Sequence, residues 1–424
     1  MKASPQTSPR IRKAPASGAL GVAEWTAWIF ILLSAGRVGE LIPGLGHIPF
    51  AKIIAAIWLC AVLSRGKSRA ITSLLSVPIV RVALALLVLA VCSLSFSIFL
   101  GASVAFLTGT GAVVAIAFTL LCNTPRSWRF VIGTLRCLVV TATILALAAV
   151  AFSGGGRIAA GVSYDTNDLA YVLVTALPLA IAFSMLTRGR ARLLYIGISA
   201  LLILASLLTQ SRGGALSLMA IVLCLICMDL RPSTSKNSAG NTLRKRIGRL
   251  VVFGMVAVLA WSVLPQTTKE RLSTLQDISS DYNAKTNITR GRGAIWKRNW
   301  DAVTERPIGF GINSFMAVDG RHGGDWMAPH NSLLQVTVEL GFLGLFLYLR
   351  IHWLAWRSLG RTAQLAAAST TLDLEKIVFA KALRISLVSN FVAGFFLSMA
   401  YSDLLWIVLA TIVIFSNVSA LPGE

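Results

Sequence analysis

Apolar runs recur along the chain of 424 residues, and polar connections separate them. A helix needs about 20 mostly apolar residues to cross a bilayer, and the longer runs meet this requirement. The pattern predicts an all-α integral membrane protein with about twelve transmembrane helices. The predicted spans are 24–36, 50–64, 78–100, 103–122, 130–152, 168–187, 193–209, 213–229, 247–264, 331–349, 377–398 and 400–417.

One long connection, about 266–329, interrupts this pattern and predicts a large loop carrying short amphipathic helices. Its segment AIWKRNWDAVTE, residues 294–305, places Ile295, Trp296, Trp300 and Val303 on one helical face, which suits a membrane interface. The predicted organisation is a disordered basic tail (1–22), helices one to nine (23–264), the loop with a catalytic segment (265–330), and helices ten to twelve (331–424).

The composition agrees with a membrane protein, because 56% of the residues are hydrophobic and only 13% are charged. Soluble domains carry about 25% charged residues. The formal net charge of +22 would indicate nucleic acid in a soluble protein. Here the basic residues concentrate in the N-terminal tail and in every second connection, as the positive-inside rule describes. This alternation predicts cytoplasmic termini, an external large loop, contact with membrane lipids and no nucleic-acid partner.

Several families of enzyme are excluded by missing motifs. The sequence has no GxxxxGK[ST] loop for a nucleotide and no HExxH or Cys/His cluster for a metal. The CxxC of Cys224 and Cys227 lies inside an apolar run and is interpreted as structural. We therefore expect no cofactor and no metal, and a substrate that reaches the external face already activated.

Arg212 is the first candidate functional residue, within the segment TQSRGGALS. A charge close to the hydrocarbon region is costly and often marks a substrate path, although a long side chain can also reach water from there. Gly213 and Gly214 permit close backbone approach and can open a helix whose positive N-terminus favours an anion. The pattern favours an anion-binding role for Arg212.

Two more candidates lie in and after the large loop. Arg290 and Arg292 precede the amphipathic helix, where they either bind an anion or belong to a solvated loop. His330 and Asn331 begin the tenth span. An external histidine at a helix start can act as a base, since the helix dipole favours the neutral imidazole. A structural role for His330 is the alternative.

The order of these motifs resembles the O-antigen ligase and polymerase superfamily of bacterial membrane glycosyltransferases. The resemblance covers about 155–400 and rests on SYDTNDLA, TQSRGGALSL, GRGAIWKRNWDAVTERPIGFGINSF and APHNSLLQVTVELGFLGL. Arg292 fits the family's Arg-x-x-x-Trp pattern better than Arg290, because Trp296 follows it four residues later.

The resemblance implies transfer of a glycan from undecaprenyl diphosphate to lipid A–core at the periplasmic face of the bacterial inner membrane. It implies an inverting, metal-independent reaction. The catalytic residues it implies are His330, Arg212 and Arg292, and the substrate-binding residues are Arg290, Asn331, Arg157, Asp165 and Asn167. About twelve spans and one loop before the histidine motif favour a ligase. An O-antigen or exopolysaccharide polymerase, a protein O-glycosylation enzyme and a non-enzymatic lipid or polysaccharide transporter remain alternatives.

Overall fold

The computed structural model describes residues 21–41, 49–64, 74–124, 127–152, 157–160, 164–230, 239–273, 291–369 and 373–419. These residues form helices, together with one isolated β-bridge between Ala160 and Tyr164. Most of the predicted tail, residues 1–20, and Arg290 lie outside the described residues.

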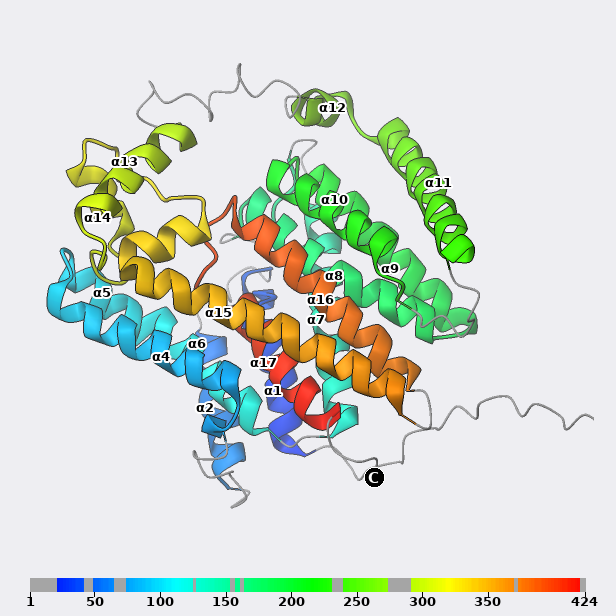
Figure 1. Cartoon of the computed structure of the whole chain (residues 1–424), viewed down its shortest axis with the longest axis horizontal. Coiled ribbons are helices and arrows are strands. Elements are labelled where there is room, and N and C mark those ends of the chain that lie inside the picture. Colours follow the sequence, from blue (N-terminus) through cyan, green and yellow to red (C-terminus); the bar gives the residue numbers. More distant parts are fainter. Residues whose placement is uncertain are drawn as a thin grey trace, which may run out of the picture.

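The helices of the first half are α1 (Val22–Ser34), η1 (Val38–Leu41), α2 (Phe50–Leu63), α4 (Pro78–Cys92), η2 (Ser93–Phe96), α5 (Leu100–Phe106), η3 (Leu107–Gly111), α6 (Ala112–Asn123), α7 (Trp128–Ala151) and α8 (Thr166–Leu186). Those of the second half are α9 (Gly189–Leu208), α10 (Arg212–Cys227), α11 (Ala239–Val263), α12 (Gln266–Ser273), α13 (Arg292–Glu305), α14 (Phe315–Arg321), α15 (Ser332–Ala368), α16 (Leu374–Gly394) and α17 (Asp403–Ser419). Figure 1 shows α11 at one edge of the molecule, where it contacts α10.

Helix α8 lies inside the bundle and packs against α7, α9, α10 and α16. Its sequence is apolar on all sides, as expected for a helix that is covered by neighbours all round. Side-chain hydroxyls fasten it to α16, because Ser386 Oγ donates to the Thr175 carbonyl oxygen at 2.6 Å. Ser389 Oγ donates in the same way to the Val174 carbonyl oxygen at 3.0 Å. The interior helix pair α8–α16 therefore fixes the positions of the segments that precede α8 and follow α16.

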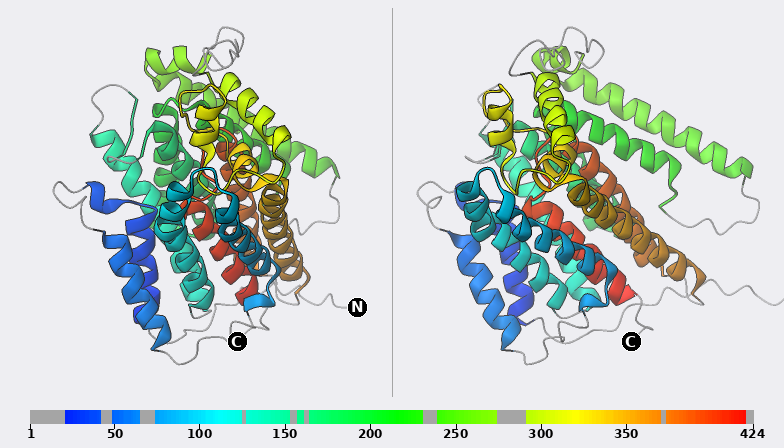
Figure 2. Two further views of the ribbon diagram at one scale, coloured as in Figure 1. Left: turned by 90° about the vertical axis from the view of Figure 1, so that its left-hand side faces the viewer. Right: turned by 60° about the vertical axis from the view of Figure 1, so that its left-hand side comes forward.

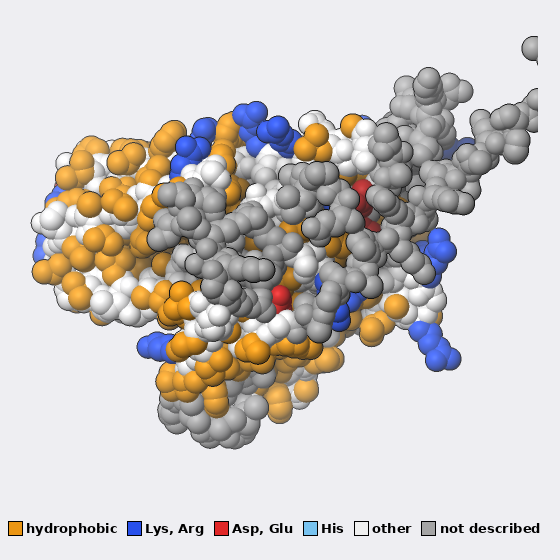
Figure 3. Space-filling model, turned by 90° about the horizontal axis from the view of Figure 1, so that it is seen from below, with side chains coloured by type: hydrophobic (Ala, Val, Ile, Leu, Met, Phe, Trp, Pro, Cys, Tyr) orange, Lys and Arg blue, Asp and Glu red, His pale blue; other side chains and the backbone are white. Residues whose placement is uncertain are grey.

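The structure confirms an all-α membrane protein. Among the described residues, seven helical stretches are long and apolar enough to cross a membrane: Pro78–Phe96, Leu100–Asn123, Trp128–Ala151, Thr166–Leu186, Gly189–Leu208, Ser332–Ala368 and Leu374–Gly394. The other five predicted spans fall on α11 and on four shorter apolar helices, α1, α2, α10 and α17. Many large apolar side chains of the described residues are exposed, and they occupy much of the coloured area of the face in Figure 3. The number of twelve spans stays a prediction.

Helix α15 differs from its prediction, since it continues to Ala368 and not to residue 349. It also contains a kink at Gly341, where φ is 68°. The Gly309–Phe310–Gly311 turn fills this kink: the Phe310 and Gly311 N–H groups donate to the carbonyl oxygens of Val338 and Glu339, both at 2.9 Å. An added Cβ at Gly309 would lie 2.5 Å from the Gly341 nitrogen, so this turn requires glycine.

Helices α13 and α14 lie together at the N-terminal end of α15 (Figure 2). The apolar face of α13 was expected at the membrane interface. Instead, Ile295 and Val303 are buried in a cluster that includes Phe315 and Val338. Trp300 alone of that face stays open, with 51% of its surface exposed. The face packs inward because α14 and α15 offer it an apolar surface, and burial there removes these side chains from water.

Candidate functional site

Arg212 is the first residue of α10, one residue before the predicted span of 213–229. Ser211 caps this helix, and its Oγ accepts a hydrogen bond from the Gly214 N–H at 3.2 Å. A Cβ at Gly213 would lie 3.0 Å from Phe396, and one at Gly214 would lie 2.8 Å from Ala170. The two glycines were expected to admit a ligand to the backbone. The structure gives another reason for them, which is close packing of α10 against its neighbours.

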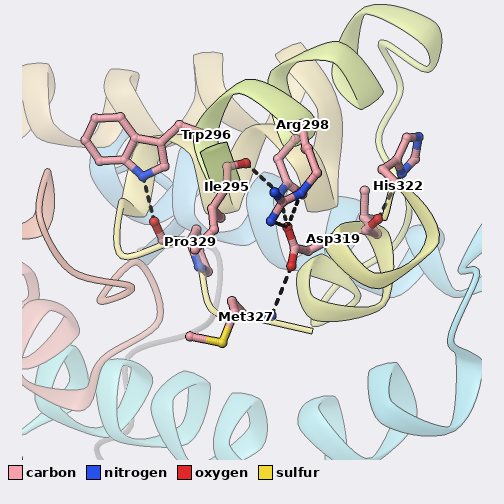
Figure 4. Close-up of polar contacts among 9 residues, drawn as sticks. Ile295, Trp296, Arg298, Asp319, His322, Met327 and Pro329 are labelled. Atoms are coloured by element: carbon pink, nitrogen blue, oxygen red, sulfur yellow. Dashed lines mark hydrogen bonds and ion pairs between the residues drawn. The ribbon is translucent and has the colours of Figure 1, made fainter. Parts of the chain in front are cut away.

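Arg292 is likewise the first residue of its helix, α13. One turn later, the Trp296 indole N–H donates to the Pro329 carbonyl oxygen at 2.8 Å (Figure 4). Pro329 immediately precedes His330, so this bond holds the start of α13 beside the histidine. Residues 291–329 of the large loop therefore lie against the start of α15.

His330 lies half-buried in a conformation that is unusual for a residue with a side chain. Its φ is 47°, in the left-handed region, and such strain persists only where the surroundings enforce it. Here its backbone N–H donates to Ser398 Oγ at 3.0 Å. Burial and then the Arg292 charge lower the pKa of His330 below its ordinary value, while Asp165 acts in the opposite direction. The imidazole is therefore neutral near pH 7.

The connection between α16 and α17, residues 395–402, joins these parts, and we call it the linking segment. Phe396 packs on Gly213, and the Phe395 ring lies 5.7 Å from that of Trp296. Ser398 accepts the His330 N–H. The residue after Arg212, the tryptophan one turn after Arg292 and the His330 backbone, far apart in sequence, thus contact one segment. Sequence reasoning missed this segment, because one serine inside an apolar run gives no signal of its distant partners.

Asp165 caps the N-terminus of α8 and is exposed. Its Oδ1 accepts hydrogen bonds from the backbone N–H groups of Asn167 at 2.6 Å and Asp168 at 2.8 Å. The Asn167 side chain donates to Asp165 Oδ2 at 3.4 Å. The Asp165 charge acts on the pKa of His330 in the direction that favours protonation.

Asn331 and Arg157 have structural partners that the sequence did not predict for them. Asn331 is buried and caps α15, where its Oδ1 accepts from the Leu333 and Leu334 N–H groups at 2.9 and 3.0 Å. An asparagine directly before an apolar helical run is a recognised capping signal, so this role was readable. Arg157 is exposed, and its Nε donates to the Thr209 carbonyl oxygen at 3.2 Å, which places it beside the segment of Arg212.

Four helices, α8, α10, α13 and α15, begin at or next to these residues. Side chains already cap three of these helix starts, through Asp165, Ser211 and Asn331. The arginines remain suited to an anion, because an arginine fork binds phosphate oxygens with two parallel bonds. Arg292, which acts on the pKa of His330, could therefore hold a phosphorylated anion near a neutral histidine. Within the described residues there is no group of three or more His, Cys, Asp or Glu side chains that could hold a metal ion.

Comparisons with known proteins identify related sequences. Residues 197–349 match the family model described as O-antigen ligase, which covers the chain from α9 to the middle of α15. A protein of Rickettsia felis described as "Putative polysaccharide ligase" is 30% identical over 182 residues, 39% of this chain and 44% of that protein. A similarly described protein of Rickettsia conorii is 28% identical over 205 residues, 44% of this chain and 48% of that protein. The matched regions thus span less than half the length of these curated relatives.

Proposed function

We propose that this chain, which belongs to the O-antigen ligase superfamily through its residues 197–349, is an O-antigen ligase. It transfers O-antigen polysaccharide from undecaprenyl diphosphate to a sugar hydroxyl of lipid A–core at the periplasmic face of the bacterial inner membrane. The observation that supports the proposal is the linking segment, which contacts Gly213 next to Arg212, Trp296 one turn after Arg292, and the backbone of His330. The descriptions of both relatives as polysaccharide ligases favour a ligase over a polymerase.

In the proposed reaction, the neutral His330 ring accepts the proton of the acceptor hydroxyl as the oxygen forms a bond to the anomeric carbon. The bond from that carbon to the diphosphate oxygen breaks on the opposite face, so the configuration inverts. Arg212 and Arg292 stabilise the negative charge that develops on the leaving diphosphate. Asp165 stabilises the imidazolium that forms, because an opposite charge favours the protonated ring. His330 then loses its proton to solvent.

The remaining residues contribute to substrate binding in this proposal. Arg157, beside Thr209, adds a second positive charge near Arg212. Asn167 and the Nδ2 group of Asn331 offer polar contacts to sugar hydroxyls, while the Asn331 oxygen is committed to the cap of α15. Arg290, outside the described residues, keeps its proposed role in donor binding. The energy stored in the diphosphate explains why no nucleotide motif is needed.

Deletion of the gene, followed by lipopolysaccharide gels and analysis of lipid-linked glycans, tests the function. We expect loss of O-antigen from lipopolysaccharide together with accumulation of long lipid-linked polymer, and restoration by the plasmid-borne wild-type chain. A single repeat attached to core would instead identify a polymerase. Unchanged lipopolysaccharide and unchanged lipid-linked glycans would contradict both enzymes.

The pH dependence of transfer follows from the protonation state of His330. The base must be neutral, and its pKa lies below the ordinary value of about 6.5 because of burial and the Arg292 charge. Activity should therefore be lost only as the pH falls through a value below 6.5, and should stay level through pH 7. We expect Arg292→Ala to move this acid limb of kcat/KM upward, because the charge that opposes protonation is removed. An acid limb of kcat/KM that stays in place would show that the Arg292 charge does not act on the pKa of His330.

A further inference from the structure

We propose that Asp319 is a positioning residue, whose carboxylate fixes the helix that carries Arg292 against the segment that ends in His330. This inference rests on the proposed function for the roles of Arg292 and His330. Asp319 itself lies on α14, where it is fully buried, so it does not meet the substrate. It acts through its contacts with two other elements.

The first contacts of Asp319 are to α13 (Figure 4). Its Oδ1 accepts hydrogen bonds from Arg298 Nε at 3.1 Å and Arg298 Nη2 at 2.8 Å. The same oxygen accepts from Asn299 Nδ2 at 3.2 Å. Arg298 and Asn299 stand about two turns after Arg292, and a helix is rigid over that length. The carboxylate therefore sets the position of α13 as a whole.

The second contacts of Asp319 are to the chain that leads to His330. Its Oδ2 accepts the Met327 backbone N–H at 3.1 Å, and its carbonyl oxygen accepts the Gly324 N–H at 2.8 Å. A Cβ at Gly324 would lie 2.2 Å from Asp319 Oδ2, so this close approach requires glycine. Met327 precedes His330 by three residues. One carboxylate thus links both elements, and the Trp296–Pro329 bond links them a second time.

A buried ion pair of this kind fixes the relative position of two elements more than it stabilises the fold. Withdrawing two charges from water offsets much of their attraction, whereas a fork of fixed hydrogen bonds admits one arrangement only. Helix α13 carries a natural comparison in Lys297 and Asp301, whose Nζ and Oδ2 lie 2.8 Å apart. These two side chains are 67% and 54% exposed, and such surface pairs contribute little. They therefore provide the matched control.

The variants Asp319→Asn and Arg298→Lys test the proposal, with Lys297→Ala as the control. In Asp319→Asn, one carboxylate oxygen is replaced by an NH₂ group, which cannot accept the hydrogen bonds that Asp319 now accepts. In Arg298→Lys, the ammonium group cannot reproduce the two hydrogen bonds of the guanidinium. Both variants should therefore let α13 shift. A displacement of about 1 Å can lower turnover on the order of 10²-fold, and we expect such a loss in kcat at normal membrane abundance. Lys297→Ala should retain wild-type turnover.

The pH profile separates positioning from simple damage. Arg292 from α13 and Asp165 from α8 are the charges that face His330. Loss of the Asp319 charge alone would lower the His330 pKa further, whereas movement of Arg292 away would raise it. We therefore expect Asp319→Asn to shift the acid limb upward in the wild-type background, and to give no upward shift in the Arg292→Ala background. A limb that moves down or stays would overturn the proposal.

A distance measurement makes the test independent of activity. Spin labels at Thr304→Cys and Asp325→Cys, both exposed positions, would report the separation of α13 from the His330 segment. The background replaces the six native cysteines. We expect a broader or displaced distance distribution in Asp319→Asn and an unchanged one in Lys297→Ala. An unchanged distribution in Asp319→Asn would overturn the proposal. Absence of transfer by the wild-type chain would contradict the proposed function alone.

Discussion

Replacement of His330 by alanine should lower turnover by about 10²–10⁴-fold, the usual cost of losing a general base. The protein should still fold and bind donor, because the fixed contact of this residue is its backbone N–H to Ser398 Oγ, which alanine retains. His330→Asn is a second useful variant, since asparagine tolerates the left-handed backbone found at this position. Single-turnover transfer by the purified protein, with donor binding measured separately, is the appropriate assay.

His322 provides the matched control for this experiment. It lies in the same loop and is also half-buried, but its Nδ1 contacts the Val318 carbonyl oxygen at 2.8 Å. His322→Ala should therefore keep turnover close to wild type. If His330→Ala were as active as His322→Ala, the base assignment would be wrong, and the helical architecture would be unaffected.

Hydrophobic periodicity predicted most of the helices, since each apolar run coincides with a helix of the structure. Arg212 was also expected at a helix start, because two glycines after a polar cluster are a local signal. The structural features that could not be predicted depend on contacts with residues distant in the sequence. The kink at Gly341 exists because the Gly309–Gly311 turn, about thirty residues earlier, supplies donors to the opened carbonyls. The sequence around Gly341 contains no signal that predicts those donors.

The site shows the same division between local and distant signals. Asn331 and Asp165 precede helices and were readable as caps from their neighbours alone. Ser398 and Asp319 were missed, because their importance lies in contacts with His330 and Arg298, which are 68 and 21 residues away. A buried carboxylate that links two elements has no signature in one sequence. Only the folded chain brings Ser398 to His330 and Asp319 to Arg298.

Arg212 and Arg292 should both be required for use of the donor, and lysine should not replace either of them. The planar guanidinium donates two parallel hydrogen bonds to phosphate oxygens, whereas an ammonium group offers a point charge. Arg212→Lys and Arg292→Lys should therefore lose much of the activity despite keeping their charge. Each alanine variant should lose more, on the order of 3–5 kcal/mol of transition-state stabilisation, or roughly 10²- to 10⁴-fold, if its charge pairs with a desolvated phosphate.

The two arginines should also act as one unit, because both are proposed to contact the same leaving group across the linking segment. The double alanine variant should then lose less than the product of the single losses. Arg321, an exposed arginine on α14 that donates to the Ile98 carbonyl oxygen, is the matched control, and Arg321→Ala should lose little. Chelators should leave transfer intact, since arginines supply the positive charge that a divalent ion supplies elsewhere. Activity that disappears in EDTA and returns with magnesium or manganese would refute this mechanism, as would a fully active Arg212→Ala.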